Sequence, residues 1–282
     1  MARCQKVTIS VLILLLLSCK QSVPESSGAT FTFVPEQNGK AKAWSLADLQ
    51  MGANPQIIEG YDPYYAKKKR FSAVSLGAIA TKSFGLSTAD LQHRHFVLRA
   101  RDGYQVPMDG ERLFEDASAY LAFQDVDVPG FEPIGPQKVS PAPFYLVWAK
   151  PHQIDLETHP RPWQLASIEM RSFESVYPHT VPPTEASALS QKGFRLFREG
   201  CIRCHAVNRE GGRVGPDLNV PQNVLEYRPE VQVRAYIRNP RTFRYSNMPA
   251  HPHLTDGDLD ALIEYFRSMK DQKFDPDRSE AK

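Results

Sequence analysis

Cysteine is scarce in this chain of 282 residues: there are four, and none lies between Cys19 and Cys201. This scarcity argues against a zinc site built from several cysteine pairs, and it leaves no thiolate in the middle of the chain to bind a metal. An excess of one charge is also missing, because 34 Lys and Arg residues balance 32 Asp and Glu residues. The composition therefore gives no argument for nucleic acid binding through an overall positive charge.

The chain has an apolar run at its N-terminus. Residues 7–17 are almost wholly apolar and follow two cations. The run is short for a membrane-spanning helix and typical of a secretory signal. Its end, Leu16-Leu17-Ser18-Cys19, resembles the lipobox of bacterial lipoproteins, in which the Cys carries lipid. We expect a signal peptide over 1–18 and a lipidated Cys19 that begins a flexible tether over 19–37. An ordinary signal peptide or an uncleaved anchor is the alternative.

Two of the cysteines form the motif Cys201-Ile202-Arg203-Cys204-His205. This spacing is that of a c-type haem attachment site, where each thiol adds to one vinyl group and the His ligates the iron. A structural disulfide, half a zinc site and a redox-active thiol pair are the alternatives. The first two lack further cysteines nearby, and the third does not require the adjacent His. Covalent haem also requires export, which agrees with the N-terminal signal.

The region before residue 180 mixes strands with helices, and strands predominate. Alternating or apolar stretches predict strands over 31–34, 95–100, 104–108, 144–148 and 163–170. Ser45 is expected to cap a helix that continues through Leu49. Helical spacing of apolar residues predicts a second helix over 113–123.

Four pieces of this region, in this order, resemble the molybdopterin-binding domain of the sulfite oxidase family. They are the turn at 102–104, a helix ending at 120–123, the strand at 144–148 and the segment 163–168. In that family a Cys ligates molybdenum, and this region has none. The resemblance therefore implies a mixed α/β domain over 38–180 without the metal site, which argues against molybdopterin as a cofactor.

Two further groups of residues in this region invite a functional interpretation. Lys67 to Arg70 are four consecutive cations, which would suit an acidic partner or, as we prefer, a solvated edge strand. Histidines without recognisable ligand spacing are expected to be exposed or hydrogen-bonded. They are His93, His95, His152, His159 and His179.

The pattern becomes helical after a Pro-rich linker at 181–187, whose prolines favour an extended spacer. Ser190 is expected to cap a helix that runs into Cys201, a middle helix is expected over 231–237, and Thr255 is expected to cap the last helix. The motif at the helix end resembles class I cytochromes c, which implies an all-α domain over 188–272. A charged, disordered tail is predicted over 273–282.

The resemblance to class I cytochromes c also implies site residues. In Gly-Pro-Asp-Leu, the Pro216 carbonyl would orient His205. Met248 before a Pro resembles that family's sixth ligand, with His251, His253 and Met269 as alternatives. Arg238, Arg244 and Tyr245 are candidates for contacts with the haem propionates, although the sequence does not decide among them. A basic rim from Arg195 to Arg244 would steer an acidic partner or serve only solubility.

Together these features predict a membrane-anchored, mono-haem c-type cytochrome in the bacterial cell envelope, facing the periplasm from the inner or outer membrane. With His/Met ligation it would transfer single electrons between redox proteins that the sequence does not identify. An alternative is the haem domain or subunit of a molybdopterin-dependent, sulfite-oxidase-like dehydrogenase, and a further one is the haem subunit of a larger dehydrogenase. Metal analysis and co-purification distinguish these readings.

Overall fold

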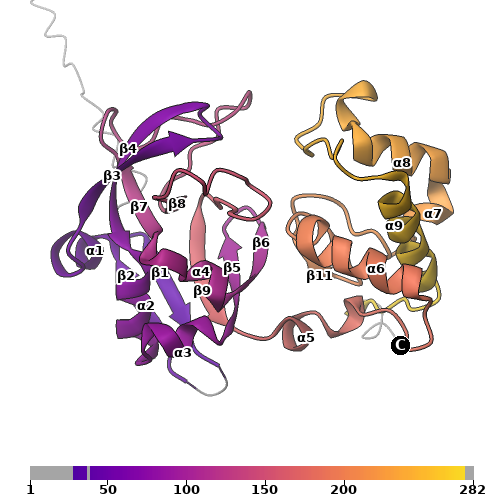
Figure 1. Cartoon of the computed structure of the whole chain (residues 1–282), viewed down its shortest axis with the longest axis horizontal. Helices are drawn as coiled ribbons and strands as arrows, with labels where there is room; N and C mark the ends of the chain where they lie inside the picture. The colour runs from indigo at the N-terminus through magenta and orange to yellow at the C-terminus, as the bar shows by residue number, and fades with distance from the viewer. Residues whose placement is uncertain (1–27, 37–38, 277–282) are drawn as a thin grey trace, which may run out of the picture.

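A computed structural model describes residues 28–36 and 39–276, which form two bodies joined by a single crossing segment (Figure 1). The strand-rich body precedes the helical one in the chain. Within these residues no helix has the length and apolar character needed to span a membrane. Cys19 and the predicted signal peptide lie outside the described residues.

The first body contains two sheets. The five-stranded sheet has the order β2-β1-β9-β5-β6, with β1 and β9 parallel and the other pairs antiparallel. The antiparallel four-stranded sheet has the order β3-β4-β7-β8. Their bounds are β1 Thr30–Val34, β2 Lys42–Ser45, β3 Gln56–Asp62, β4 Lys67–Ser75, β5 His95–Ala100, β6 Gln105–Asp109, β7 Ala119–Asp125, β8 Tyr145–Trp148 and β9 Leu165–Met170.

Short helices complete the first body. They are α1 Leu46–Gly52, α2 Leu76–Phe84, α3 Thr88–Gln92 and α4 Gly110–Leu113, followed by the 3₁₀ turn η1 Glu115–Ala117. Both sheets contribute to one hydrophobic core, for example through Phe31 of β1, Leu98 of β5 and Leu121 of β7, all fully buried. The five predicted strands are confirmed within a residue or two at each end.

The predicted tether is wrong at its C-terminal end. Residues 30–34, which fall inside the range 19–37, form β1, and β1 pairs with both β2 and β9. Phe31 and Phe33 are fully buried and their rings meet edge to face at 5.1 Å. The folded domain therefore begins before the predicted residue 38.

The helix predicted over 113–123 is also wrong. Helix α4 ends at Leu113, and residues 119–125 form β7, which is paired on both sides. Most of β7 is buried on both faces, so its apolar run has no alternation that would distinguish it from a helix. This removes one of the four pieces on which the resemblance to the sulfite oxidase family rested. The sulfite oxidase-like fold stays a prediction.

The basic run at Lys67 to Arg70 begins β4. These four residues pair with β3, and the pairing of β4 with β7 starts only at Phe71. Three of the four residues are exposed, and the exception is Lys69. Lys69 is 4% exposed and forms ion pairs with Asp125 and Glu132. Buried cations need such partners because desolvation is costly.

Helix caps were the most readable local signals. Ser45 and Thr255 each form a capping box with the acid three residues later, as predicted for the cap position. The cap of the helix before the haem motif is Ser187 and not Ser190. Ser190 is fully buried and its hydroxyl lies 2.7 Å from that of Ser268 on the last helix.

The second body is built mainly of helices. Its elements are α5 Phe173–Val176, η2 Pro178–Thr180, α6 Ala188–Leu196, the π-helical turn η3 Phe197–Cys201, β10 Ala206–Val207, β11 Glu210–Gly211, α7 Val224–Tyr227, α8 Glu230–Arg238, η4 Pro240–Thr242 and α9 Asp256–Met269. Helices α6 and α9 cross at Gly193. A Cβ there would lie 1.9 Å from the Ala261 carbonyl oxygen, so only glycine permits this approach.

The predicted boundaries of the second body are too narrow. Phe173 and Tyr177, before the predicted linker, are buried in its hydrophobic core. Within the linker region, the backbone amide of Ala186 donates to the Pro183 carbonyl, so the chain turns there. At the other end, Phe274 stacks on His179 at 3.6 Å, so the predicted tail is ordered at its start. The second body thus begins near residue 172.

Candidate haem site

The two motif cysteines lie on consecutive helical turns. Turn η3 delivers Cys201, whose carbonyl accepts the backbone amides of Cys204 at 3.1 Å and His205 at 2.9 Å. Both thiols are free. Burial raises the pKa of Cys201 to about 12 and that of Cys204 to about 11. Redox-active thiol pairs need a lowered thiol pKa, so this environment disfavours the dithiol alternative.

The imidazole of His205 has a fixed orientation. Its Nδ1 lies 2.9 Å from the Pro216 carbonyl oxygen. Because a carbonyl oxygen only accepts, Nδ1 carries the hydrogen and the lone pair of Nε2 remains for a metal. Burial lowers the pKa of His205, which favours the neutral ligating form.

Gly215 lies against the face of the His205 ring. A Cβ at this position would be 2.4 Å from Cε1 of the imidazole, so any larger residue would displace the ring. The Gly-Pro pair thus does two things: it leaves room for the imidazole and presents the carbonyl that orients it. Cys201, Cys204 and His205 fit a covalent haem. The two thiols are free, and among the hydrogen bonds of the described residues the imidazole Nε2 has no protein partner.

Met248 lies in the loop between η4 and α9. Its side chain is partly buried and packs against the core of the second body, as does Cys201. The amide of Met248 donates to the Ser246 hydroxyl at 3.2 Å, and the amide of His251 donates to the Ile237 carbonyl at 3.2 Å. The part of the loop that follows Met248 is therefore held to α8.

The other predicted site residues are placed differently. Met269, an alternative sixth ligand, is 1% exposed within α9. Arg238 forms an ion pair with Asp256 at 2.5 Å, the guanidinium of Arg244 lies 6.0 Å from the ring centre of Tyr236, and Tyr245 is exposed. The proposed propionate contacts stay predictions.

A ladder of three buried asparagines, Asn208, Asn219 and Asn223, holds the segment after the motif to α9. It was not predicted from the sequence. Asn223 Nδ2 donates to Asn219 Oδ1 and to the Phe266 carbonyl, at 2.7 and 2.8 Å. Asn219 Nδ2 donates in turn to Asn208 Oδ1 and to the Met269 carbonyl, at 2.8 and 2.9 Å. The last carbonyls of a helix need such partners. The only sequence signal was three Asn residues among apolar neighbours.

The haem motif itself contacts the first body. Arg203 donates from Nη1 to the Leu156 carbonyl at 3.1 Å and from Nη2 to the Glu157 carbonyl at 2.7 Å. Its own carbonyl accepts the amide of Gln105 at 3.1 Å. The side chain between the two cysteines therefore anchors one body to the other.

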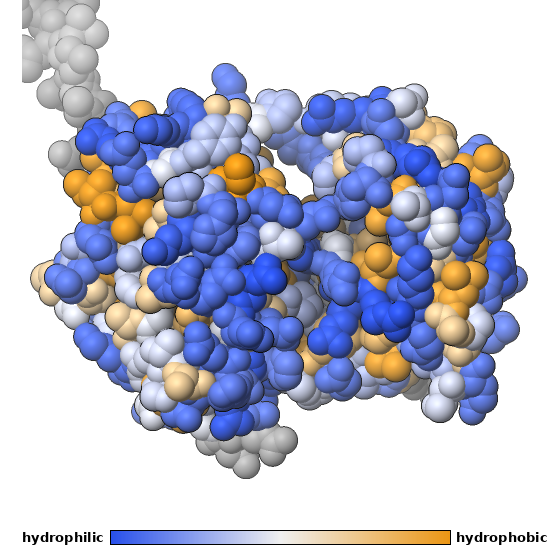
Figure 2. Space-filling model, viewed as in Figure 1, coloured by the Kyte–Doolittle hydropathy of each residue, from blue (hydrophilic) through white to orange (hydrophobic). Residues whose placement is uncertain are grey.

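A cavity of about 540 Å³ lies between the bodies, next to Cys201. Figure 2 shows the boundary between them as hollowed and mainly hydrophilic. Five arginines and three acids line it: Arg112, Arg171, Arg195, Arg198, Arg203, Asp109, Glu157 and Glu199. The cavity is therefore bordered by more cations than anions.

The histidines of the first region behave as predicted where the structure shows partners. His95, His159 and His179 form close contacts with Asp109, Glu115 and Glu210, at 2.7, 2.6 and 2.5 Å. The sequence did not anticipate that His251 and His253 both face Glu157, at 3.8 and 3.2 Å. These two residues lie about a hundred positions after their partner, and no local pattern connects them.

Comparison with known proteins agrees with this geometry for the second body. Residues 190–270 match the family model for cytochrome c. Cytochrome c oxidase subunit 2 of Alkalihalophilus pseudofirmus is 38% identical over 96 residues, covering 31% of this chain and 27% of that protein. Lupanine 17-hydroxylase (cytochrome c) of a Pseudomonas species is 33% identical over 88 residues, covering 30% of this chain and 12% of that protein.

A further relative, cytochrome c oxidase subunit 2 of Bacillus subtilis, is 29% identical over 116 residues, 36% of this chain and 30% of that protein. The chain thus spans less than a third of the length of each of these relatives. The C-terminal region is a cytochrome c domain, which implies covalently bound haem c and haem-based electron transfer.

Proposed function

We propose that the whole chain is a mono-haem cytochrome that passes single electrons between redox proteins while anchored by lipid on Cys19 to a bacterial envelope membrane, facing the periplasm. The observation that carries the proposal is the His205 imidazole, held by the Pro216 carbonyl with Nε2 available beside two free thiols. The bound haem would supply a one-electron redox couple. Thioether bonds from Cys201 and Cys204 would keep it attached.

We assign Met248 as the sixth ligand. Its thioether lies at the edge of the core that Cys201 also borders. The competitors are engaged elsewhere, since Met269 is packed within α9 and the two histidines face Glu157. With His and Met both bound, the iron has no open position, so the chemistry is electron transfer without substrate binding at the metal. Arg238, Arg244 and Tyr245 remain the proposed propionate contacts.

Replacing Met248 tests this assignment. Met248→Ala in the haem-loaded protein should remove the weak near-infrared charge-transfer band of Met-ligated ferric haem and lower the reduction potential, because a soft thioether favours the reduced iron. Met269→Ala is the matched control and should keep the band. A band that persists in Met248→Ala and disappears in Met269→Ala would reverse the assignment.

The membrane anchor has its own test. Cys19→Ser should abolish labelling with a radioactive fatty acid and release the protein from the membrane fraction, while haem staining stays unchanged. Unaltered labelling of Cys19→Ser would reject the lipidated cysteine and leave the ordinary signal peptide or uncleaved anchor.

The surroundings of Cys201 support an acidic redox partner. The cavity beside it has five arginines against three acids, and such a rim raises the association rate of a negatively charged partner. Charge reversal of Arg195 and Arg198 should slow electron transfer from an acidic donor and flatten its dependence on ionic strength. An unchanged salt dependence would place the docking surface elsewhere.

A second candidate function is suggested by one relative. The name lupanine 17-hydroxylase (cytochrome c) describes an enzyme, so a domain similar to this one also occurs in an enzyme chain. By this alternative the domain would receive electrons from a molybdopterin-dependent dehydrogenase, either fused or as a partner subunit. Molybdenum in stoichiometric amount with iron in the purified protein would favour it over the electron carrier, and co-purification of a larger subunit would favour the partner version.

A further inference from the structure

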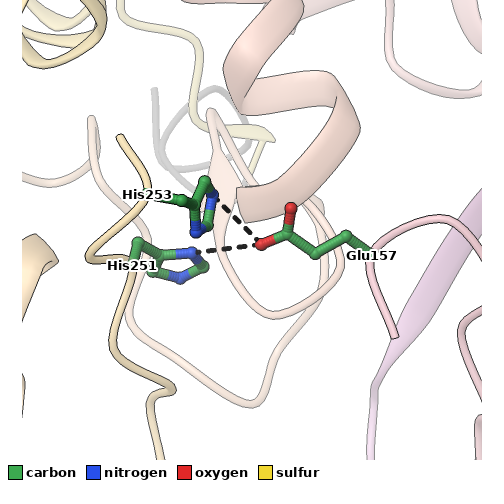
Figure 3. A group of neighbouring side chains, drawn as sticks. All are labelled: Glu157, His251 and His253. Carbon is green, nitrogen blue, oxygen red and sulfur yellow. Dashed lines mark ion pairs between the residues drawn. The ribbon is translucent and has the colours of Figure 1, made fainter. Parts of the chain in front are cut away.

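Three side chains that could ligate a metal converge where the two bodies meet (Figure 3). Glu157 belongs to the loop after β8 in the first body, and His251 and His253 belong to the loop that carries Met248. One ligand atom from each lies within 4.8 Å of the other two. In Figure 3 both imidazoles point toward the same carboxylate oxygen.

Backbone contacts fix both segments that carry the three side chains. His251 and His253 flank Pro252, whose ring restricts the backbone between them, and the two imidazole centres are 5.7 Å apart. The amide of His251 is fixed to the Ile237 carbonyl. On the opposite side, Arg203 holds the carbonyls of Leu156 and Glu157. The three ligands therefore need only side-chain adjustment to meet.

The chemistry of the three groups favours one class of ion. Two imidazoles and a carboxylate suit Zn²⁺, Cu²⁺ or Ni²⁺ better than the all-oxygen sites that Mg²⁺ and Ca²⁺ prefer. With metal–ligand bonds of about 2.1 Å, tetrahedral ligand atoms lie about 3.4 Å apart. The pairs at 3.2 and 3.8 Å are already near this spacing.

Accessibility also fits an exchangeable ion. The side chains of Glu157 and His253 are 56% and 49% exposed, while His251 is 17% exposed. Burial lowers the pKa of His251, so this imidazole is neutral, as a ligand must be, at lower pH than a free one. An ion can therefore enter from solvent and find one partly shielded ligand.

We propose that Glu157, His251 and His253 bind a divalent transition-metal ion of the imidazole-preferring class, and that this ion clasps the Met248 loop to the first body. The ion would join two segments that otherwise meet through side-chain contacts of exposed groups. The site is separate from His205 and Met248, and it rests on the proposed assignment of Met248, because His251 and His253 are the alternative sixth ligands.

Zn²⁺ is the suitable probe because it is redox-inactive and leaves the oxidation state of haem unchanged. Haem-loaded full-length protein, stripped with a chelator, should bind one Zn²⁺ per chain in isothermal titration calorimetry, with proton release and with affinity that rises between about pH 5 and pH 7. Zn²⁺ should also raise the thermal unfolding temperature.

Variants locate the ion. Glu157→Gln, His251→Ala and His253→Ala should each weaken Zn²⁺ binding by at least about tenfold and remove the thermal stabilisation. His93→Ala removes an exposed histidine of the first body and should bind as tightly as the parent protein. Haem absorbance and circular dichroism of Glu157→Gln, which keeps size and shape, establish that the variant is folded.

Three results would overturn the proposal. One is a dissociation constant for Zn²⁺ in the parent protein weaker than about 1 mM. Another is an equal affinity in the parent and in all three ligand variants, which would place the bound ion elsewhere. The third is a thermal unfolding temperature that changes with pH but not with added Zn²⁺, which would leave an ordinary His–Glu contact.

Discussion

The two bodies bury polar groups by different chemistry. In the first, buried charges compensate one another: the guanidinium of Arg161 lies 3.3 Å from Asp62, and Tyr145 donates to the same carboxylate at 2.8 Å. In the second, the buried polar groups at the haem motif are neutral amides, the ladder of Asn208, Asn219 and Asn223. In the first body the buried charges stabilise the fold itself, whereas in the second neutral amide side chains hold the loops around the proposed cofactor.

This difference suits the proposed division of labour. A redox site gains or loses a charge in each cycle, and neutral amides around it hold the loops without titrating. The first body has no cysteine, and its buried Asp62 and Lys69 are occupied by partners. We therefore assign electron transfer to the second body.

Loss of the attachment site should produce the largest effect and confine it to the second body. Cys201→Ala together with Cys204→Ala should abolish covalent haem, because no thioether bond can form. Haem staining after denaturing electrophoresis measures this directly. Cys19→Ser is the control, since it also removes a thiol and should stain normally; residual stain in the double variant would mean that haem is attached elsewhere.

Loss of a buried charge should damage the first body alone. Asp62→Asn leaves Arg161 buried without its counter-ion, and breaking such a pair costs about 3–5 kcal/mol. Denaturant unfolding followed by tryptophan fluorescence should show this loss, while haem absorbance changes at the parent's midpoint. Both bodies losing stability together would show that they unfold as one unit.

A matched exposed pair provides the control for Asp62. Arg70 and Asp127 form an ion pair with roughly half-exposed side chains. Arg70→Ala should therefore leave the free energy of unfolding nearly unchanged.

Breaking the amide ladder should have an intermediate effect on the second body. Asn223→Ala leaves the Phe266 carbonyl without its donor and removes the cap of α7, at a cost of about 1–3 kcal/mol. Haem should remain attached. Unfolding followed at the haem band measures the loss, and Asn239→Ala at an exposed position is the control.

The smallest effect concerns acid stability. The side chains of Lys192 and Thr255 hold the pKa of Asp258 well below its usual range and tie α6 to α9. A carboxyl with a lowered folded pKa contributes stability above its unfolded pKa and loses it as pH falls toward the folded value. Asp258→Asn should make the free energy of unfolding fall less steeply below about pH 4. The total difference from the parent protein should be less than about 1 kcal/mol. An unchanged slope would assign the acid sensitivity to other carboxyls.

The sequence predicted what is encoded by neighbouring residues. The haem motif, the caps at Ser45 and Thr255, and the strands with clear alternation were all readable because each depends on a few adjacent positions. Strand β7 was misread because its pairing with β4 and β8, and not its own pattern, makes it a strand.

Features built from distant residues were not predictable. The asparagine ladder and the group of Glu157, His251 and His253 each join segments from separate elements of the fold. The domain boundary was missed for the same reason, since Phe173 packs against Phe194 across the predicted linker. One sequence shows the residue types but not which of them meet.

Counting the electrons that one chain accepts tests the central claim most directly. Anaerobic reductive titration of the purified, haem-loaded protein, followed at the haem absorption band, should consume one electron per chain and fit a single one-electron Nernst curve. The reduced protein should not bind carbon monoxide, because both axial positions are filled. Two or more electrons per chain, or a carbon monoxide complex, would contradict a single His/Met-ligated haem acting as an electron carrier.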